Sequence, residues 1–587
     1  MERLDQPAAP ARASAPRRRR RLGRIWPWLL ALGVAYLVLL PIGSLVYGAF
    51  RTETPGAPDA AFTADWFRAT YLELFTGGPI QRVVWHSLAL AAPATLFATV
   101  LGVALAWLLT RTDVPCRRFF EYAFLTPMLY SPLVGIIGWT ILAAPGGGWA
   151  NHYWKQLGGA GDWVNIYSFW GIVWVMALFY LPYAIIFTTA TFRAMDASQE
   201  EAAAVSGASR FWVLTRITLP LMRPSIFAAA IFIFIFCLEQ FSIPGAIGSQ
   251  IRYETLAYSV YLNVTKYPSN LGLAAAKGTL LLVLTIVILI FYRRMIAKSN
   301  RFVTVGAKGQ RPAVMRLGKW RPVALAVCAA TLMVGTVLPL AAIIVRSLMP
   351  SRVIGIDWGS LRLTSLTNLV SQSNFIEATW NSVSLSVGAA VVGTVLGLIL
   401  AVSTVRLARS RAITLSDYML SAPVALPGTV FGIGLLWAYI GSPLYQSLTL
   451  LLLAFVTRYA VFGVRMIGAG MLQIDKSLSE AAQISGASRA KAVGLIDLPL
   501  LAGSVSAAWL LVFLSVMREL PTSIIIYGVD SRTLAILTWN YMEDGFYNTA
   551  SALAVAQIVI VVVIVAAAKG VFGRRLRLGE AFGRGNE

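Results

Sequence analysis

Long apolar stretches separated by shorter polar segments run along the whole chain. A helix needs roughly 20 apolar residues to cross the hydrocarbon core of a bilayer, and twelve stretches have about that length. They form two sets of six: 26–50, 82–110, 119–143, 167–190, 224–247 and 271–292, then 322–346, 377–404, 412–440, 447–467, 504–528 and 548–568. The pattern predicts an all-α polytopic membrane protein with about 12 transmembrane helices.

The composition supports a membrane protein and excludes several other classes. Apolar residues make up 57% of the 587 residues and charged residues 13%, which is about half the usual globular share of charge. The net charge of +23 would suit a nucleic-acid binder, but such proteins are rich in polar surface. Disordered and collagen-like chains are excluded by the same numbers, and we expect the partner surface to be a lipid bilayer rather than nucleic acid.

Basic residues cluster at three places that fix the orientation. They are the run Arg17–Arg21, the connection 293–321 with nine Lys or Arg and no acid, and the segment after the last span. An excess of Lys and Arg marks the cytoplasmic side, so we expect both termini and the central connection to be cytoplasmic. Arg17–Arg21 could also be read as a nucleic-acid patch or an export signal, but the apolar stretch behind it is too long for a cleaved signal.

These boundaries divide the chain into five parts. They are a basic cytoplasmic N-terminal segment, a first six-helix half, a basic cytoplasmic linker, a second six-helix half and a cytoplasmic tail: 1–25, 26–292, 293–321, 322–568 and 569–587.

The sequence offers little material for catalysis or metal binding. Cys116, Cys237 and Cys328 have no paired spacing, and His86 and His152 are the two histidines. The phosphate-binding pattern G-x-x-x-x-G-K-[ST] does not occur. We therefore expect no catalytic site, no metal site and no cofactor in this chain, so that any ATP would be bound by another chain.

The two sets of six spans are copies of each other. Residues 85–87 align with 380–382 at an offset of 295, and residues 196–221 align with 475–500 at an offset of 279, with 14 of these 26 positions identical. Because each copy has six spans, both insert in the same direction, so the duplication is parallel rather than inverted. The repeated loop lies between the fourth and fifth spans of each half.

Each copy of this loop predicts a short helix, a turn and a return to the membrane. Its serine and glutamate have the spacing of a capping box, Ser198 with Glu201 and Ser477 with Glu480. Alanines favour the helix, a glycine allows a bend or the close approach of another backbone, and a proline marks the next helix boundary. These residues are Ala202, Ala203, Gly207 and Pro220 in the first copy and Ala481, Ala482, Gly486 and Pro499 in the second.

The repeated segment resembles the EAA loop of binding-protein-dependent ABC transporter permeases, E-A-A-x3-G followed by I-x-L-P. Besides the residues above, Ile217 and Leu219 in the first copy and Ile496 and Leu498 in the second match this pattern. The resemblance implies the type I importer (MetI-like) fold in each half, with both halves fused in one polypeptide. It also implies that 198–210 and 477–489 are coupling helices, each docking one ATPase subunit.

The same resemblance implies the partners and the location. We expect two ATP-binding cassette ATPase subunits, forming a homodimer, which bind ATP and Mg, and an extracytoplasmic solute-binding protein that delivers the solute. The chain would be a multi-pass permease of the bacterial cytoplasmic membrane and not itself an enzyme.

A narrower resemblance concerns the substrate. Residues 518–522 read Arg-Glu-Leu-Pro-Thr and resemble the K-E-L-P-A-T stretch of fused iron(III) transport permeases, with Trp539 and Asp544 also fitting. Iron(III) is the expected substrate. Permeases for thiamine, 2-aminoethylphosphonate, polyamines and sulfate share parts of these patterns and remain alternatives.

Four polar residues lie near the end of the fifth span of each half: Glu239, Gln240, Arg518 and Glu519. A charge at bilayer depth costs at least ~2.5–3.5 kcal/mol, so it is normally paired or faces a water-filled path. We expect these residues to line the translocation path, the alternative being that they stabilise helix packing or reach the interface. Lys277 and His86 are expected to be interfacial anchors, and Tyr180 and Tyr183 to pack as aromatics: these four lie outside the predicted path.

Two other classes of protein compete with this interpretation. A secondary transporter with two parallel halves would need no ATPase, and the duplicated EAA loops would then have no purpose. A membrane-embedded enzyme would need a carboxylate, His or metal cluster near the membrane face, and the sequence shows none.

Overall fold

The computed structural model describes residues 17–54, 57–195, 198–299, 314–350, 355–406, 410–423 and 426–572. These residues are predominantly helical, and their β-structure consists of three isolated bridges. Among them, nine helices are long and apolar enough to cross a membrane, or up to eleven if each of two bent pairs forms one span. The polytopic all-α fold predicted from the sequence is therefore confirmed.

The helices of the first half are α1 (Arg17–Gly48), α2 (Asp65–Thr76), α3 (Pro79–Arg111), α4 (Arg117–Ala123), α5 (Pro132–Ala143), α6 (Trp149–Gln156), α7 (Phe169–Ala194), α8 (Ser198–Val205), α9 (Arg210–Val213), α10 (Leu219–Glu239), α11 (Leu256–Thr265) and α12 (Leu271–Ser299). Those of the second half are α13 (Arg321–Leu332), α14 (Leu338–Ser347), α15 (Thr364–Val370), α16 (Ser373–Val405), α17 (Arg411–Ser421), α18 (Gly428–Tyr439), α19 (Leu448–Gln473), α20 (Lys476–Ile484), α21 (Arg489–Ala492), α22 (Leu498–Leu500), α23 (Ala502–Met517), α24 (Ser523–Ile526), α25 (Leu534–Glu543) and α26 (Tyr547–Phe572).

The third apolar stretch of each half is not a straight helix. The predicted span 119–143 consists of α4 with the short turn after it and α5, which meet at 98°. Pro132 is the first residue of α5, where a proline is tolerated because its missing N–H would have no helical partner. The predicted span 412–440 is likewise divided into α17 and α18, the latter directly after Pro427. Apolar composition alone does not reveal these breaks.

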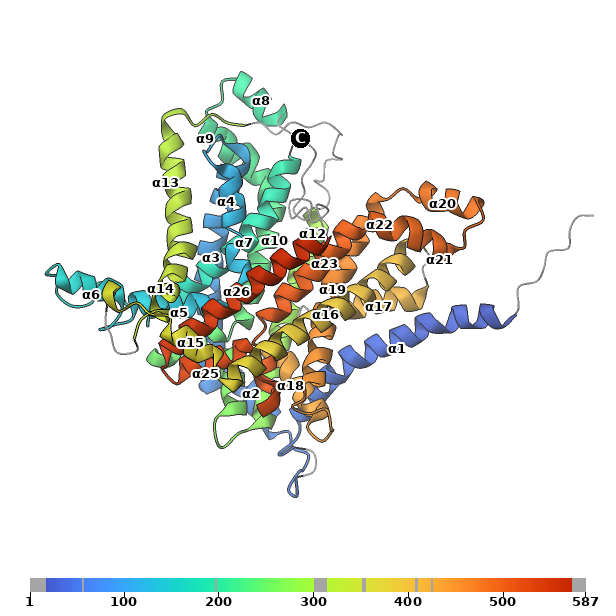
Figure 1. The fold of residues 1–587 in the computed structure, drawn as a ribbon, viewed down its shortest axis with the longest axis horizontal. Coiled ribbons are helices and arrows are strands. Elements are labelled where there is room, and N and C mark those ends of the chain that lie inside the picture. Colours follow the sequence, from blue (N-terminus) through green and yellow to red (C-terminus); the bar gives the residue numbers. More distant parts are fainter. Residues whose placement is uncertain are drawn as a thin grey trace, which may run out of the picture.

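The long helices form two bundles, one from each half. In the first half α3 packs against α7 and α10, and in the second α16 packs against α19 and α23. In Figure 1 the two bundles diverge toward the end that carries α8 and α20 and come together at the opposite end, near α2, α18 and α25. One continuous buried apolar cluster includes residues of both bundles, among them Phe241 of the first half and Phe513 of the second.

The first helix of each half packs on the other half. Helix α1 contacts α17 and α18, whereas α14 contacts α5. Each contact brings a glycine against the backbone of a proline: a Cβ at Gly138 would overlap Pro339, and a Cβ at Gly434 would overlap Pro41. The two halves therefore exchange their first helices through equivalent contacts, in which only a glycine lets the backbones approach this closely.

These contacts predict that Gly138→Ala and Gly434→Ala destabilise the protein. The added methyl group meets backbone atoms rather than a flexible side chain, so we expect a loss of about 1–3 kcal/mol for each substitution. Thermal unfolding of the purified protein in lipid nanodiscs measures this loss.

The matched control is Gly135→Ala, one turn earlier in α5, where a Cβ would meet nothing within 4 Å. This change should be neutral or slightly stabilising, since alanine has the higher helix propensity. Equal melting temperatures for Gly135→Ala and Gly138→Ala would contradict the proposed contact.

Candidate functional site

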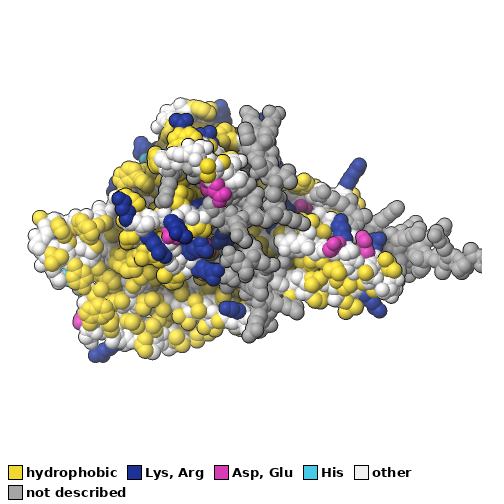
Figure 2. Space-filling view, turned by 90° about the horizontal axis from the view of Figure 1, so that it is seen from above, with side chains coloured by type: hydrophobic (Ala, Val, Ile, Leu, Met, Phe, Trp, Pro, Cys, Tyr) yellow, Lys and Arg dark blue, Asp and Glu magenta, His cyan; other side chains and the backbone are white. Residues whose placement is uncertain are grey.

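Both EAA loops project from the same end of the molecule. Helices α8 and α20 lie beyond the ends of the two bundles in Figure 1. Seen from above in Figure 2, this end shows Lys and Arg side chains with a few acidic ones, while hydrophobic side chains cover most of the flanks. An apolar residue at equivalent positions of the two loops is almost fully exposed, Val205 at 90% and Ile484 at 88%. Exposed apolar side chains at equivalent tips are typical of a surface that docks a partner.

The glycine of each loop ends the short helix. Gly207 has φ +84° and Gly486 has φ +93°, so both lie in the left-handed region. Just after each glycine, a backbone N–H donates back into the helix, from Ala208 to Ala203 and from Ala487 to Ala482. This is the usual glycine-dependent end of a helix. A Cβ at either glycine would meet no atom of this chain within 4 Å, so backbone conformation rather than crowding within the chain requires a glycine.

The predicted capping box of the second loop is wrong. Helix α20 begins at Lys476, and its cap is Asp475, two residues before the predicted cap Ser477. The Asp475 carboxylate accepts a hydrogen bond of 2.9 Å from the backbone N–H of Ser477. This bond holds the pKa of the Asp475 carboxyl below its usual value. An aspartate before the serine supplies the stronger, charged acceptor. Helix α8 begins at Ser198, and the position equivalent to Asp475 lies outside the described residues.

The remaining EAA residues divide between the tips and the stems of the loops. Glu201, Ala202, Glu480 and Ala481 are exposed, and Ala203 and Ala482 are partly buried. Ile217 and Ile496 lie in short π-helical segments, Leu214–Thr218 and Val493–Asp497, that lead into the fifth span. Leu219 and Pro220 begin α10, and Leu498 and Pro499 begin α22. The residue before each of these helices, Thr218 or Asp497, is already helical, so the helix changes type near the proline and does not begin there. The predicted helix boundary at each proline is therefore not confirmed.

The polar residues predicted at the ends of the fifth spans lie where the two halves meet. Helix α10 ends at Glu239 and α23 ends at Met517, so Arg518 and Glu519 follow directly. The Glu239 Oε2 atom lies 3.7 Å from Nη2 of Arg458 in α19, and each side chain is 10% exposed. Arg458 was not expected from the sequence, because it lies within an apolar stretch that reads as an ordinary span. The one signal in the sequence is the charge itself, because a charged residue in a membrane span is normally paired with another polar group.

Arg518 forms a second link between the halves. Its guanidinium donates to the carbonyl oxygen of Met128 at 2.9 Å and to the hydroxyl of Tyr183 at 3.3 Å. Glu519 instead accepts hydrogen bonds from the backbone N–H groups of Thr522 and Ser523, which follow it in the chain. The pair at the end of α23 therefore has two roles, one residue joining the halves and the other fixing the turn.

Gln240 and Lys277 both form hydrogen bonds with serine hydroxyls of the first half. The Gln240 Oε1 atom accepts a hydrogen bond from Ser242, at 3.4 Å. Lys277 is 8% exposed and donates to Ser259 at 2.7 Å. The expectation that Lys277 is an interfacial anchor is therefore wrong, because α11 folds back against α12 and covers it.

An aromatic cluster joins the halves at the end opposite α8 and α20. Trp539 of α25 is fully buried, and its indole N–H donates to the Tyr261 hydroxyl at 3.1 Å. The Phe241 ring lies 5.4 Å from that of Trp539 between centroids, and the Tyr261 hydroxyl donates to Glu543 at 3.2 Å. The structure is thus closed between the halves at this end (Figure 1).

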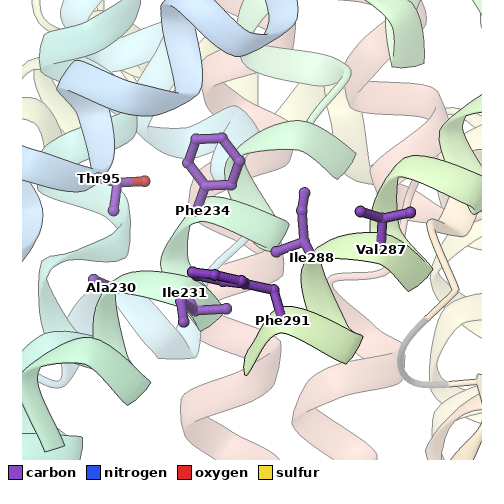
Figure 3. A pocket seen from close by; sticks show the side chains of 7 residues that line it. All are labelled: Thr95, Ala230, Ile231, Phe234, Val287, Ile288 and Phe291. Atoms are coloured by element: carbon purple, nitrogen blue, oxygen red, sulfur yellow. The ribbon is translucent and has the colours of Figure 1, made fainter. Parts of the chain in front are cut away.

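A groove of about 430 Å³ lies between α3, α10 and α12 (Figure 3). Its lining is apolar except for Thr95, and two of its side chains are largely exposed, Val287 at 58% and Phe291 at 59%. It contains none of the four polar residues expected to line the path. The groove therefore belongs to the apolar outer surface rather than to the contact between the halves. Among the described residues no group of three or more His, Cys, Asp or Glu side chains is placed to hold a metal ion.

The buried pair predicts a specific pattern of stabilities. Arg458→Met leaves Glu239 buried without its counter-charge, which typically costs about 3–5 kcal/mol. The double variant Arg458→Met/Glu239→Gln removes both charges and should regain most of the loss. Thermal unfolding in lipid nanodiscs compares the variants, and a double variant no more stable than Arg458→Met would show that the two groups do not interact.

Comparisons with known proteins agree with this architecture. The family model described as "Binding-protein-dependent transport system inner membrane component" matches twice, at residues 98–301 and 393–578. The ferric transport system permease protein FbpB of Actinobacillus pleuropneumoniae is 26% identical over 82% of this chain and 70% of its own length. The probable ABC transporter permease protein y4fN of Sinorhizobium fredii is 25% identical over 95% of this chain and 98% of its own. The putrescine permease PotI of Escherichia coli is 26% identical over 37% of this chain and 79% of its own.

Both matches include the EAA loop of their half, and together they cover more than half of the chain. The chain therefore belongs to the binding-protein-dependent transport system inner membrane components, the permeases of ABC importers, and it carries two such components fused in one polypeptide.

Proposed function

We propose that α8 and α20 each dock one ATPase subunit, so that two such subunits, a homodimer, bind ATP and Mg and drive this permease. The observation that supports this proposal is the duplicated loop, whose two tips expose Val205 and Ile484 at the same end of the molecule. Two similar docking surfaces suit two identical partners. The chain itself would carry out no chemistry.

The end with α8 and α20 is assigned to the cytoplasm. The last part of the linker 293–321 lies at this end, because the backbone N–H of Met315 donates to the carbonyl oxygen of Arg111, the last residue of α3. This basic linker would then be cytoplasmic, in agreement with the excess of Lys and Arg expected on that side. The opposite end would receive the solute from an extracytoplasmic binding protein.

Transport would require the contacts between the halves to open and close in turn. In this structure Trp539 and Tyr261 close the outer end, while the bundles diverge on the cytoplasmic side. We propose that Glu239, Gln240, Arg518 and Glu519, together with Arg458, border the path that opens when these contacts separate. Their polar atoms would replace water around a charged or polar solute.

The proposed solute is iron(III). This proposal rests on the relatives that match along both halves, among which the FbpB protein of Actinobacillus pleuropneumoniae is named for ferric transport. A polyamine is the second candidate, because the putrescine permease PotI also matches, although over 37% of this chain. The binding protein would set most of the selectivity.

The loop geometry predicts the effect of changing the two glycines. Gly207→Val and Gly486→Val place a β-branched residue in the left-handed region, which misplaces the tip of each coupling helix. We expect ATP hydrolysis by the reconstituted complex to continue while transport falls at least tenfold, about 1.4 kcal/mol of coupling. Gly494→Ala is the control, since Gly494 also has open space around it but no left-handed conformation. Transport at the wild-type rate in both valine variants would exclude the coupling role.

Uptake measurements test the solute and the energy source. Proteoliposomes containing the permease, its copurified ATPase and its binding protein should take up radioactive iron(III) when ATP is enclosed, and should not take up radioactive putrescine. Putrescine uptake without iron uptake would establish the second candidate. Uptake without any ATPase would instead show a secondary transporter.

A further inference from the structure

A buried arginine lies beneath each EAA loop. Arg111 is the last residue of α3, and Arg406 directly follows α16. These two residues are equivalent at the offset of 295 that relates the second spans of the two halves. Their side chains are 3% and 7% exposed, so each guanidinium needs a counter-charge.

In the first half the counter-charge comes from the coupling helix. Nη2 of Arg111 lies 3.0 Å from Oε2 of Glu200 in α8. The other carboxylate oxygen of Glu200 accepts a hydrogen bond of 2.7 Å from the hydroxyl of Thr218, at the start of the fifth span. One carboxylate therefore connects three elements: the end of α3, the coupling helix and the stem of α10.

In the second half the same three elements are connected, but the counter-charge comes from the stem. Nη2 of Arg406 donates to Oδ1 of Asp497, just before α22, at 3.0 Å. The hydroxyl of Ser479 in α20 donates to the same Asp497 oxygen, also at 3.0 Å. The Asp497 side chain is fully buried.

The two arrangements differ by an exchange of positions. At the offset of 279, Glu200 is equivalent to Ser479 and Thr218 to Asp497. The carboxylate and the hydroxyl have thus changed places between the coupling helix and the stem, while the arginine stays in place. With serine in place of Glu200 alone, the arginine would have no acid beside it. With aspartate in place of Thr218 alone, it would have two. The pair of differences preserves one guanidinium, one carboxylate and one hydroxyl in each half.

We propose that each of these triads is a joint that positions its coupling helix on the membrane helices, and that the joint accepts the acid on either element. The three are positioning residues, and the proposal rests on the proposed docking of ATPases at α8 and α20. Helix α8 has 8 residues and α20 has 9. An isolated helix this short is at best marginally stable in water. Each therefore depends on its tertiary contacts for its position, and the triad ties it to two long helices at once.

The exchange also makes the two joints unequal. Coupling helix α8 is held through an ionised side chain, whereas α20 is held through the neutral hydroxyl of Ser479. Both contacts involve a carboxylate, but Glu200→Ser leaves the buried Arg111 without its counter-charge, which is the more costly loss. Ser479→Ala, which leaves the pair between Arg406 and Asp497 intact, should therefore reduce coupling less than Glu200→Ser does.

The test transplants the second arrangement into the first half. The variants are Glu200→Ser, Thr218→Asp and the double variant Glu200→Ser/Thr218→Asp, each in the full chain reconstituted with its ATPase and binding protein. We expect Glu200→Ser to lower transport per ATP hydrolysed about tenfold. The double variant restores the acid beside Arg111 and should return this ratio to within about twofold of the wild type.

The control is Glu121→Ser, which removes the ion pair of 2.9 Å with Arg193 in the same half without touching the loop. It should keep the wild-type ratio. If Glu200→Ser lowered only the melting temperature and the yield of the complex, leaving transport per ATP unchanged, the triad would be structural and the proposal would be overturned. If the double variant were as impaired as Glu200→Ser, the proposal that the joint accepts the acid on either element would be overturned.

The reciprocal double variant Ser479→Glu/Asp497→Thr provides the same comparison in the second half, in case Glu200→Ser does not assemble. Failure of the proposed function is recognised separately, because the wild-type chain would then show no ATPase-dependent transport. In that event a thermal-unfolding cycle of the same variants still tests the triad: no recovery of stability in either double variant would overturn it.

Discussion

A guanidinium inside an apolar bundle must lie beside an acid or a polar group, and this requirement determines where the parts of the protein are joined. Among the described residues, such arginines include Arg111, Arg406, Arg458 and Arg518, which are almost fully buried or lie between the halves. The first two link α8 or α20 to long membrane helices, and the last two connect one half to the other. Because a buried ion pair contributes more to defining an arrangement than to overall stability, these links suit parts that have to change position.

The EAA loops were predictable because their signals are local. Short-range spacing identifies Glu201, Ala202 and Gly207, and the second copy repeats the same letters, so the positions of the loops followed from the sequence. The predicted cap of α20 was two residues too late, since Asp475 and Ser477 both suit the capping position and only the backbone geometry decides between them. The twelve-span pattern likewise came from apolar length alone, which does not register the 98° bend before Pro132.

The connections between the halves could not be predicted, because they depend on residues far apart in the chain. Arg458 faces Glu239, and Arg518 reaches Met128; no spacing rule relates such positions. The triads were partly predictable: they are less evident from the sequence than the EAA loops and more evident than the connections between the halves. The alignment of the two loops already contains the differences at Glu200 and Thr218, but two mismatches between copies read as ordinary divergence until the structure places them around one arginine.

The exchange of first helices has a consequence for the order in which the protein is made. Helix α1 packs on α18, and α14 packs on α5, so neither half contains all of its own packing partners. Ribosomes add about 5–20 residues per second, and at that rate about 20–80 s separate the synthesis of Gly48, at the end of α1, from that of Gly428, at the start of α18. During this interval α1 lies in the membrane before its packing partner α18 has been made. The packing of the first half is therefore completed only when the second half is present.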